Sequence, residues 1–264
     1  MALVDTHCHL QSPRFDPDRD EVLAAALEHL DWIAVIGDDI EGSRAALALV
    51  GPRVHAVVGM HPYNAKDVDS AVLDELRALA VEPGVVALGE MGLDYFNEYS
   101  PRADQARAFE AQLELACELG LPVVIHNRDA DADCHAMLSN YAQALPGCIM
   151  HCFGSGAEYA EKFLELGFYI SFAGNVTFTK ATDLQDAARL VPMDRLLVET
   201  DAPYLAPVPL RGKVKRCEPH FVTHTAAFLA DLKQVPLDDL VSATTANACR
   251  VYRIDGQGGS GARA

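Results

Sequence analysis

The chain has 264 residues, half of them apolar, which is enough for one large hydrophobic core. Asp and Glu outnumber Lys and Arg by 38 to 21, giving a formal net charge of −17, and this charge disfavours binding of extended nucleic acid through a basic surface. A phosphate group is still an allowed ligand where metal ions and a few local cations reverse the field. The seven cysteines include no Cys-x-x-Cys pair, so they fit neither a disulfide framework nor a zinc ribbon.

No membrane or secretion signal is evident at the start of the chain. The first residues run directly into an apolar strand, without the basic and apolar stretches of a signal peptide. No apolar run reaches the roughly 18 residues that suggest a membrane span. We expect a cytoplasmic protein with no membrane partner and no obvious protein partner.

Eight short apolar segments alternate with segments of helical periodicity along the chain. The first predicted strand covers residues 3–10 and is followed by a predicted helix over 20–30. The other strands are predicted over 32–37, 54–59, 85–90, 122–126, 147–151, 168–171 and 195–200, with helices over 41–50, 71–80 and 102–119 and further helical segments between the later strands.

This alternation calls for parallel strands joined by right-handed crossovers. Eight such units predict an α/β protein with a closed TIM (β/α)8 barrel, a single domain over residues 1–255. An open doubly wound sheet is the alternative, and it is disfavoured because no Gly-x-Gly-x-x-Gly follows the first strand. Residues 256–264 are rich in Gly and are predicted to form a disordered tail.

Polar residues close several of the apolar runs. Because active sites of such barrels lie at the carboxyl ends of the strands, these residues should meet at one mouth. They are His7, His9, Glu90, His126, His151 and Asp201. Alternation along the first strand is expected to place His7 and His9 on one face and Thr6 and Cys8 on the other, and to turn Cys8 and Cys152 away from the site as packing residues.

Six such ligands suffice for two divalent ions. We expect His7, His9 and Asp201 around one ion, His126 and His151 around the other, and Glu90 in a bridging position. Two adjacent ions can clamp an oxyanion and generate a metal-bound hydroxide nucleophile, which predicts hydrolysis. Imidazole ligands favour Zn, Mn, Fe or Ni, and Mg is a further option.

Six motifs follow one another in order between residues 3 and 254. They are HCH at 7–9, GMHP at 59–62, GEMGLDY at 89–95, HNRDA at 126–130, HCF at 151–153 and ETDAPYL at 199–205. Together they resemble the signatures of TatD-type metal-dependent deoxyribonucleases. The resemblance implies an amidohydrolase-like TIM barrel, two divalent metals and phosphodiester hydrolysis on DNA, often as a 3′ to 5′ exonuclease.

The resemblance also implies residue roles. Asp201 would be the general base and Glu90 the second catalytic carboxylate, while His61 and Arg128 would contact the substrate phosphate. His61 could instead be a turn residue preceding Pro62. Arg128 could instead form a salt bridge with Asp129 or Asp94.

One loop departs from the family pattern. Cys217 stands before Glu218-Pro219 where the family usually has Asn, which puts the local hydrogen bonding in doubt. The same loop carries the densest basic cluster, which could receive phosphates or be a solvated surface. Its members are Arg211, Lys213, Lys215 and Arg216.

Two other functions compete with a nuclease. An amidase or esterase of the wider amidohydrolase type, acting for example on aminoacyl-tRNA, would use the same barrel and metals. Some of those enzymes bridge the metals with a modified lysine on the fourth strand, where this chain has Glu90. The third hypothesis is a non-catalytic metal-binding protein. Such a protein would be expected to lack some of the six ligands, whereas all six positions are filled here.

Overall fold

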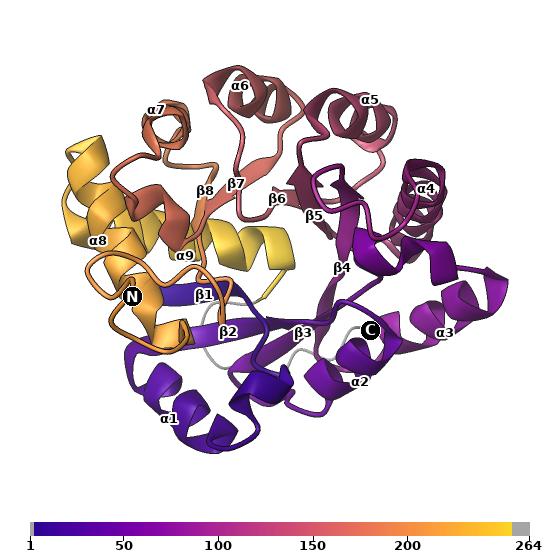
Figure 1. The fold of residues 1–264 in the computed structure, drawn as a ribbon, viewed down its shortest axis with the longest axis horizontal. Coiled ribbons are helices and arrows are strands. Elements are labelled where there is room, and N and C mark those ends of the chain that lie inside the picture. The colour runs from indigo at the N-terminus through magenta and orange to yellow at the C-terminus, as the bar shows by residue number, and fades with distance from the viewer. Residues whose placement is uncertain (1–2, 255–264) are drawn as a thin grey trace.

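All eight predicted strands are present in the computed structural model, which describes residues 3–254. They pair in parallel and in chain order within one eight-stranded sheet, so the predicted TIM barrel in a single domain is confirmed (Figure 1). The strands are β1 (Leu3–Cys8), β2 (Leu30–Ile36), β3 (Val54–Val58), β4 (Val85–Asp94), β5 (Val123–Arg128), β6 (Cys148–Met150), β7 (Tyr169–Phe172) and β8 (Leu196–Val198). The predicted tail, residues 256–264, lies outside the described residues.

The first and last strands meet and bring the sheet nearly to closure. Thr6 Oγ1 donates a hydrogen bond to the carbonyl of Val198 at 2.9 Å, and the backbone N–H of Asp201 donates to the carbonyl of His7 at 2.9 Å. An open doubly wound sheet would leave its two edges apart, so that alternative was wrong.

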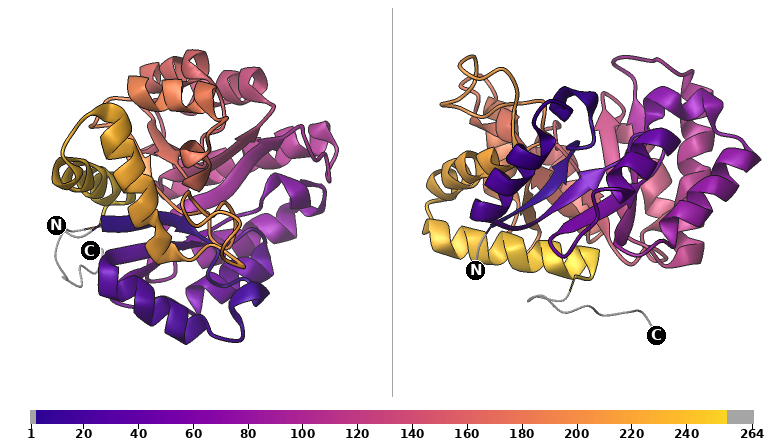
Figure 2. Two further views of the ribbon diagram at one scale, coloured as in Figure 1. Left: turned by 60° about the vertical axis from the view of Figure 1, so that its left-hand side comes forward. Right: turned by 90° about the horizontal axis from the view of Figure 1, so that it is seen from below.

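Helices surround the strands and one of them closes the bottom of the barrel. They are α1 (Arg19–His29), α2 (Ile40–Leu47), α3 (Ser70–Ala80), α4 (Arg102–Leu119), α5 (Asp131–Tyr141), α6 (Ala157–Glu165), α7 (Thr182–Leu190), α8 (Val222–Lys233) and α9 (Leu237–Tyr252), with 3-10 turns η1 (Pro13–Phe15), η2 (Pro62–Asp67), η3 (Gly174–Thr177) and η4 (Pro219–Phe221). Figure 2 shows α9 lying across one end of the barrel. Its Val251 and Tyr252 pack with Val4 of β1 and Leu197 of β8 in the barrel interior. None of the described helices is long and apolar enough to span a bilayer.

Above this apolar layer, inward positions of the strands lead to the polar mouth. Val124 and Ile149 belong to the interior cluster. Two residues after Val124 comes His126 in β5, and two residues after Ile149 comes His151, just beyond the end of β6. This is the period of two that strand geometry imposes. In β5, and in β6 with the residue that follows it, an apolar side chain thus lies low in the barrel and a histidine lies at the mouth.

Strand β1 does not keep this simple alternation. Its pairing with β2 shifts between Asp5↔Ile33 and Cys8↔Val35, so three steps on β1 match two on β2, as in a β-bulge. Thr6 faces inward, because its hydroxyl lies 3.4 Å from the Ser171 hydroxyl, which in turn bonds to a buried glutamate. The expectation that Thr6 shares a face with Cys8 was wrong, while Cys8 does turn outward and donates to the Ala34 carbonyl.

Strand β4 runs four residues beyond its predicted end at residue 90. Gly92, with φ 143°, is needed there, because a Cβ at this position would lie 1.9 Å from the carbonyl oxygen of His126. The extension carries Asp94 to the mouth beside β5.

Candidate metal centre

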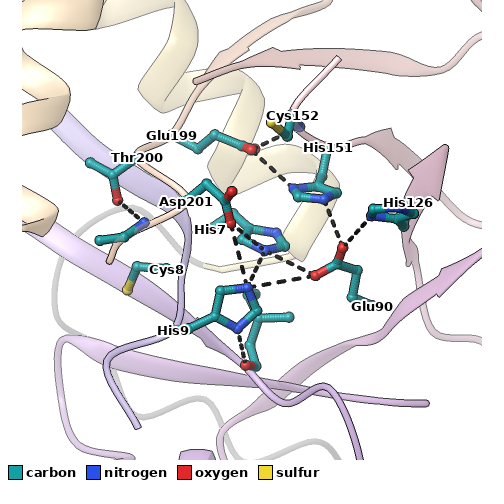
Figure 3. A network of polar contacts seen from close by, with 12 residues as sticks. His7, Cys8, His9, Glu90, His126, His151, Cys152, Glu199, Thr200 and Asp201 are labelled. Atoms are coloured by element: carbon teal, nitrogen blue, oxygen red, sulfur yellow. Dashed lines mark hydrogen bonds and ion pairs between the residues drawn. The ribbon is translucent and has the colours of Figure 1, made fainter. Parts of the chain in front are cut away.

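The six side chains predicted as metal ligands converge at the carboxyl ends of five strands (Figure 3). His7 lies in β1 and His9 one residue beyond it, Glu90 lies in β4 and His126 in β5, His151 follows β6, and Asp201 lies three residues beyond β8. Figure 3 shows their polar atoms turned toward one another around Glu90. The candidate centre is therefore assembled from residues up to 194 positions apart, from His7 to Asp201.

Two carboxylates lie close to the paired imidazoles of His7 and His9. The Nε2 atoms of His7 and His9 are 3.3 Å apart. The Nε2 of His7 lies 3.3 Å from Glu90 Oε2 and 3.8 Å from Asp201 Oδ1, and the Nε2 of His9 lies 3.7 and 3.5 Å from the same oxygens. The ligand atoms of His7, His9 and Asp201 all lie within 4.8 Å of one another, close enough to share one ion, and Glu90 Oε2 lies beside the two imidazoles.

Glu90 directs its two carboxylate oxygens to different histidines. While Oε2 faces His7 and His9, Oε1 lies 2.8 Å from both His126 Nδ1 and His151 Nε2. The side chain is 3% exposed, so its charge is compensated within the protein. The carboxylate has the position of a bridge between two histidine clusters.

Hydrogen bonds on the outer side of two imidazoles fix which nitrogen faces the centre. His9 Nδ1 donates to the carbonyl of Ile36 at 2.9 Å, and His151 Nδ1 lies 3.0 Å from Glu199 Oε1. Both oxygens are acceptors, so the outer nitrogens carry the protons. The inner Nε2 lone pairs are then available to a cation, the arrangement that metal-binding histidines usually have.

Within the protein itself, protonated histidines balance the negative charge of the carboxylates in the centre. Burial opposes protonation of His9, but the hydrogen bond and charge of Asp201 outweigh it and raise the pKa of His9 to about 9. Burial likewise opposes protonation of His126 and His151, and carboxylates again outweigh it, raising the pKa of both. The pKa of Glu90 is lowered despite burial by the surrounding histidines.

The same positions can hold divalent cations in place of protons. His126 and His151 each have both ring nitrogens facing carboxylates, and a neutral imidazole has a proton for only one of them, so the second nitrogen needs a further proton or a cation. Three groups of ligand atoms lie within 4.8 Å of one another in the described part of the chain: His7, His9 and Asp201; His7, Glu90 and His151; and His61, Glu90 and His126. The donor set of imidazoles and carboxylates suits Zn or another borderline transition metal.

Asp201 is the most exposed carboxylate of the centre, at 14%. Its backbone has φ 56°, in the left-handed region that costs energy for a residue other than Gly or Asn. The buried Asp5 holds the preceding residue by accepting from both the N–H and the hydroxyl of Thr200, at 2.9 and 2.6 Å. The segment after β8 is thus fixed so that Asp201 turns into the mouth.

His61, predicted to contact the substrate, lies within contact distance of two side chains of the centre. Its Nε2 is 3.4 Å from Glu90 Oε1 and 3.3 Å from His126 Nδ1. Its Nδ1 accepts from the backbone N–H of Tyr63 at 3.1 Å, as the cap of η2, so the turn role is present as well. Burial and the charge of His126 lower the pKa of His61, so the ring is neutral and its proton lies on Nε2. His61 therefore offers a hydrogen-bond donor to the mouth rather than a lone pair.

Arg128 lies on the rim and not in the centre. Its guanidinium stands over the ring of Phe96, with the Cζ atom 4.1 Å from the ring centroid. No ion pair joins it to Asp129 or Asp94 within residues 3–254, so the salt-bridge alternative was wrong. The side chain is exposed and lines the cleft above the centre.

Two carboxylates that the strand-end argument missed hold the outer nitrogens of ligand histidines. Glu199, fully buried, accepts from His151, and Asp94, also fully buried, lies 3.0 Å from His126 Nε2. Both lie inside the motifs given above: Asp94 is four residues after Glu90, and Glu199 is two residues before Asp201. Counting along the strand in steps of two, from Glu90 through residue 92, would have placed Asp94 on the same strand face as Glu90.

Cys152 lines the cleft, so the expectation that strand alternation turns it away was wrong. β6 ends at Met150, and Cys152 has φ 40°, so the alternation does not continue to it. Its backbone N–H donates to Glu199 Oε1 at 2.8 Å. Burial raises the pKa of the Cys152 thiol, with the nearby carboxylates adding to the effect, which keeps the thiol protonated.

A cleft of about 1070 Å³ opens over the centre and is strongly acidic. Arg128 is the one Lys or Arg among its described lining residues, against seven acidic residues: Asp38, Asp39, Glu41, Glu90, Asp129, Asp131 and Asp201. The basic cluster of the loop after β8 does not line it. Arg216 instead forms an ion pair with Asp18, at 2.7 Å, and Arg211 packs over Phe178. Cys217 is 1% exposed and its backbone N–H donates to the Pro203 carbonyl.

The chain is similar to known proteins over nearly its whole length. The model of the family described as TatD related DNase matches residues 4–253. An uncharacterized metal-dependent hydrolase of Escherichia coli K12, YcfH, is 44% identical over 261 residues, covering 97% of both chains. A protein of Cronobacter turicensis named 3′-5′ ssDNA/RNA exonuclease TatD is 38% identical over 258 residues, covering 95% of this chain and 97% of its own.

A solved structure has the same fold. The TatD homolog YJJV of Escherichia coli K12 superimposes with a TM-score of 0.89 at 28% identity, covering 96% of this chain and 98% of the other. An organophosphorus hydrolase variant of Deinococcus radiodurans, 12% identical, shares the barrel with a TM-score of 0.65. The second likeness concerns the fold alone.

Proposed function

This chain belongs to the TatD-related DNase family, and on that premise we propose that it is a two-metal phosphodiesterase that removes nucleotides from the 3′ end of single-stranded nucleic acid. The family membership confirms the resemblance seen in the sequence. Relatives over the full length are named metal-dependent hydrolases, which supports hydrolysis as the reaction class. The substrate and its polarity rest on the name of the Cronobacter relative.

The position of Glu90 carries the proposal of two ions. Each of its oxygens faces a different histidine cluster, at 3.3 Å from His7 and 2.8 Å from His126. We assign His7, His9 and Asp201 to one ion, His126 and His151 to the other, and Glu90 to both. When bound, such ions stabilise negative charge on phosphoryl oxygens and lower the pKa of water.

Asp201 is suited to take the proton of the attacking water. It combines contact with His9, at 3.5 Å, with a place in the lining of the cleft. Burial opposes its ionisation, but the hydrogen bond and charge of His9 outweigh burial and lower the pKa of Asp201. The group is therefore a carboxylate at neutral pH, the form that a general base needs.

His61 and Arg128 are suited to hold the phosphate. The Nε2–H of His61 points into the mouth and can donate to a phosphoryl oxygen in the same way as it faces Glu90 Oε1. Arg128, exposed on the rim and free of an ion pair among the described residues, can make paired hydrogen bonds to a phosphate. Arg128 adds positive charge, and His61 adds a hydrogen-bond donor, to a cleft that is otherwise acidic.

The acidic cleft limits how much nucleic acid can enter. Two divalent ions and Arg128 offset the seven lining carboxylates only near the centre, so the field elsewhere repels a polyanion. A strand end, with a single phosphodiester at the ions, meets this requirement better than an internal segment. This supports exonucleolytic rather than endonucleolytic attack.

Turnover of DNA tests the proposal. Protein loaded with Mn²⁺ or Zn²⁺ is incubated with 5′-labelled single-stranded DNA, alongside His126→Ala and the control His29→Ala, which removes an exposed histidine at the end of α1. We expect a ladder of shortened products from the wild type and the control, and none from His126→Ala. Equal turnover by His126→Ala would refute the site assignment. Turnover of an aminoacyl ester without turnover of DNA would replace the phosphodiesterase with the esterase alternative.

A further inference from the structure

Two aromatic side chains next to the centre are exposed to an unusual degree. Phe96 and Tyr99, in the loop between β4 and α4, are each 61% exposed. The half-buried Tyr63 packs edge to face against Tyr99, with centroids 4.7 Å apart. We call these three rings, together with Arg128, whose guanidinium covers one face of Phe96, the aromatic rim.

The aromatic rim is connected to the candidate centre by direct ring contacts. Tyr63 packs against His61 with centroids 4.1 Å apart, and His61 packs against His126 at 4.4 Å. Tyr63 and Arg128 also line the cleft. A ligand with its phosphate at the centre would therefore extend its neighbouring group over the rim.

Buried polar groups hold the loop of the rim in one conformation. Asp94 Oδ1 accepts from the backbone N–H groups of Phe96 and Asn97 at 3.0 and 2.7 Å. Asn97 Nδ2 donates to the Tyr63 hydroxyl at 2.6 Å. The side chain of Gln105, 1% exposed, bonds to both backbone groups of Asp94. Exposed rings on a loop fixed in this way are a preorganised surface rather than a mobile one.

Asp94 also fixes the distance between the rim and the centre. Its Oδ1 holds the loop, and its Oδ2 lies 3.0 Å from the Nε2 of His126. One buried carboxylate thus positions both a ligand histidine and the rim rings. A surface placed so strictly relative to the reacting centre fits a group of the substrate at a constant distance from the scissile bond.

We propose that the aromatic rim stacks the base of an unpaired nucleotide next to the scissile phosphate, and so restricts the enzyme to single-stranded ends. This inference rests on the proposed function. Bases stack on aromatic rings and on guanidinium planes irrespective of their sequence, and the rim presents both. A base inside a duplex has its faces covered and its edge paired, so it must be unpaired before it can reach the rim.

Binding is the first test. The metal-loaded full-length protein is titrated with a single-stranded oligonucleotide that carries 2-aminopurine in its last two positions and a terminal phosphorothioate linkage to slow hydrolysis. Stacking should quench the 2-aminopurine fluorescence, and Phe96→Ala and Tyr99→Ala should each weaken binding about tenfold and remove much of the quenching. Val81→Ala, which trims a side chain 68% exposed at the end of α3, should change neither.

Turnover of modified substrates is the second test. An abasic residue in one of the last two positions should reduce kcat/KM of the wild type about tenfold, and Phe96→Ala should lose the same factor on the normal strand. The two losses should not add, because both remove one contact. Phe96→Trp should retain the kcat/KM of the wild type, whereas Phe96→Leu should lose about as much as Phe96→Ala.

The outcomes separate this proposal from the one on which it rests. A wild type that hydrolyses and binds single strands, with equal KM and quenching in Phe96→Ala and Tyr99→Ala, overturns the rim proposal and leaves the phosphodiesterase intact. A wild type that neither binds nor cleaves oligonucleotides overturns both. Because the substituted side chains are exposed, unchanged melting temperatures should accompany the losses.

Discussion

The carboxylate of Glu199 offers the sharpest test of how the centre is held together. It is fully buried and accepts three hydrogen bonds, from His151 Nδ1 at 3.0 Å, from the backbone N–H of Cys152 at 2.8 Å and from the Ser171 hydroxyl at 2.5 Å. Glu199→Gln keeps its size and removes its charge. The amide oxygen can still accept from His151 and Cys152, while the amide nitrogen faces Ser171.

The variant should fold, because no buried group need lose its partner. Ser171 can turn its hydroxyl hydrogen toward Thr6 Oγ1, which lies 3.4 Å away, and accept from the new amide. We therefore expect a loss of about 1 kcal/mol or less in the free energy of unfolding, typical of exchanging one hydrogen bond for another.

The affinity for metal should fall much more. A charged acceptor makes the His151 ring a stronger ligand, and a hydrogen bond to a charged group is roughly twice as strong as a neutral one. Removing such a partner of a metal-binding histidine typically costs about 10–100-fold in metal affinity or activity. We expect a loss in this range for one of two ions, because His151 belongs to one cluster.

Metal titration by calorimetry, together with metal content after dialysis, measures this effect. Glu158→Gln is the matched control, because Glu158 is 74% exposed and pairs with Lys162 on the surface of α6. If Glu199→Gln binds two ions with wild-type affinity, the role given to Glu199 is refuted. A drop in affinity with an equal drop in stability would show a folding defect instead.

Three further predictions concern protons, His61 and the barrel floor. The pKa of His9 rises from 6.5 to about 9 on folding, so its stabilising contribution in chelated protein is complete below about pH 6.5 and is lost as the pH rises to about 9. The melting temperature of chelated protein should fall over that window while metal affinity rises, and an affinity independent of pH would contradict this. His61→Ala should lower kcat/KM about 100-fold without changing the metal content, whereas a lost ion would make His61 a ligand. Tyr252→Phe removes the hydrogen bond to the Thr6 carbonyl, 2.9 Å long, and urea unfolding should show a loss of about 1 kcal/mol; no loss would mean that this contact does not stabilise the floor.

The pattern of residue types along the chain was enough to predict the fold and the residues of the candidate centre. Eight apolar runs separated by helical segments admit few arrangements, because parallel strands need crossovers of one hand. Once the barrel is accepted, the residue that closes each run must reach the mouth, and this argument alone selected His126, His151 and Asp201. The structure brings them together as expected, with Glu90 between them.

Sequence reasoning failed where neighbouring strands alter the local period. The bulge in β1 places the successive residues Thr6 and His7 both on the inner side, and it arises from pairing with β2, which no property of residues 3–8 reveals. Cys152 enters the cleft because β6 ends at Met150, one residue before its predicted end and two residues before Cys152. A strand ends where the neighbouring strand offers no further backbone groups for hydrogen bonding, and those groups belong to other segments of the chain.

Candidate metal ligands could be identified before the fold was known, because ligand chemistry depends on side-chain type and on position in the strands. How each ligand is used depends on the partners that the folded barrel brings to it. The tautomers of His9, His151 and His61 follow from acceptors or donors far away in the chain or in the adjoining turn, namely the Ile36 carbonyl, Glu199 and the Tyr63 N–H. A histidine becomes a ligand or a donor according to the partner of its second nitrogen, and that partner is chosen when the barrel closes.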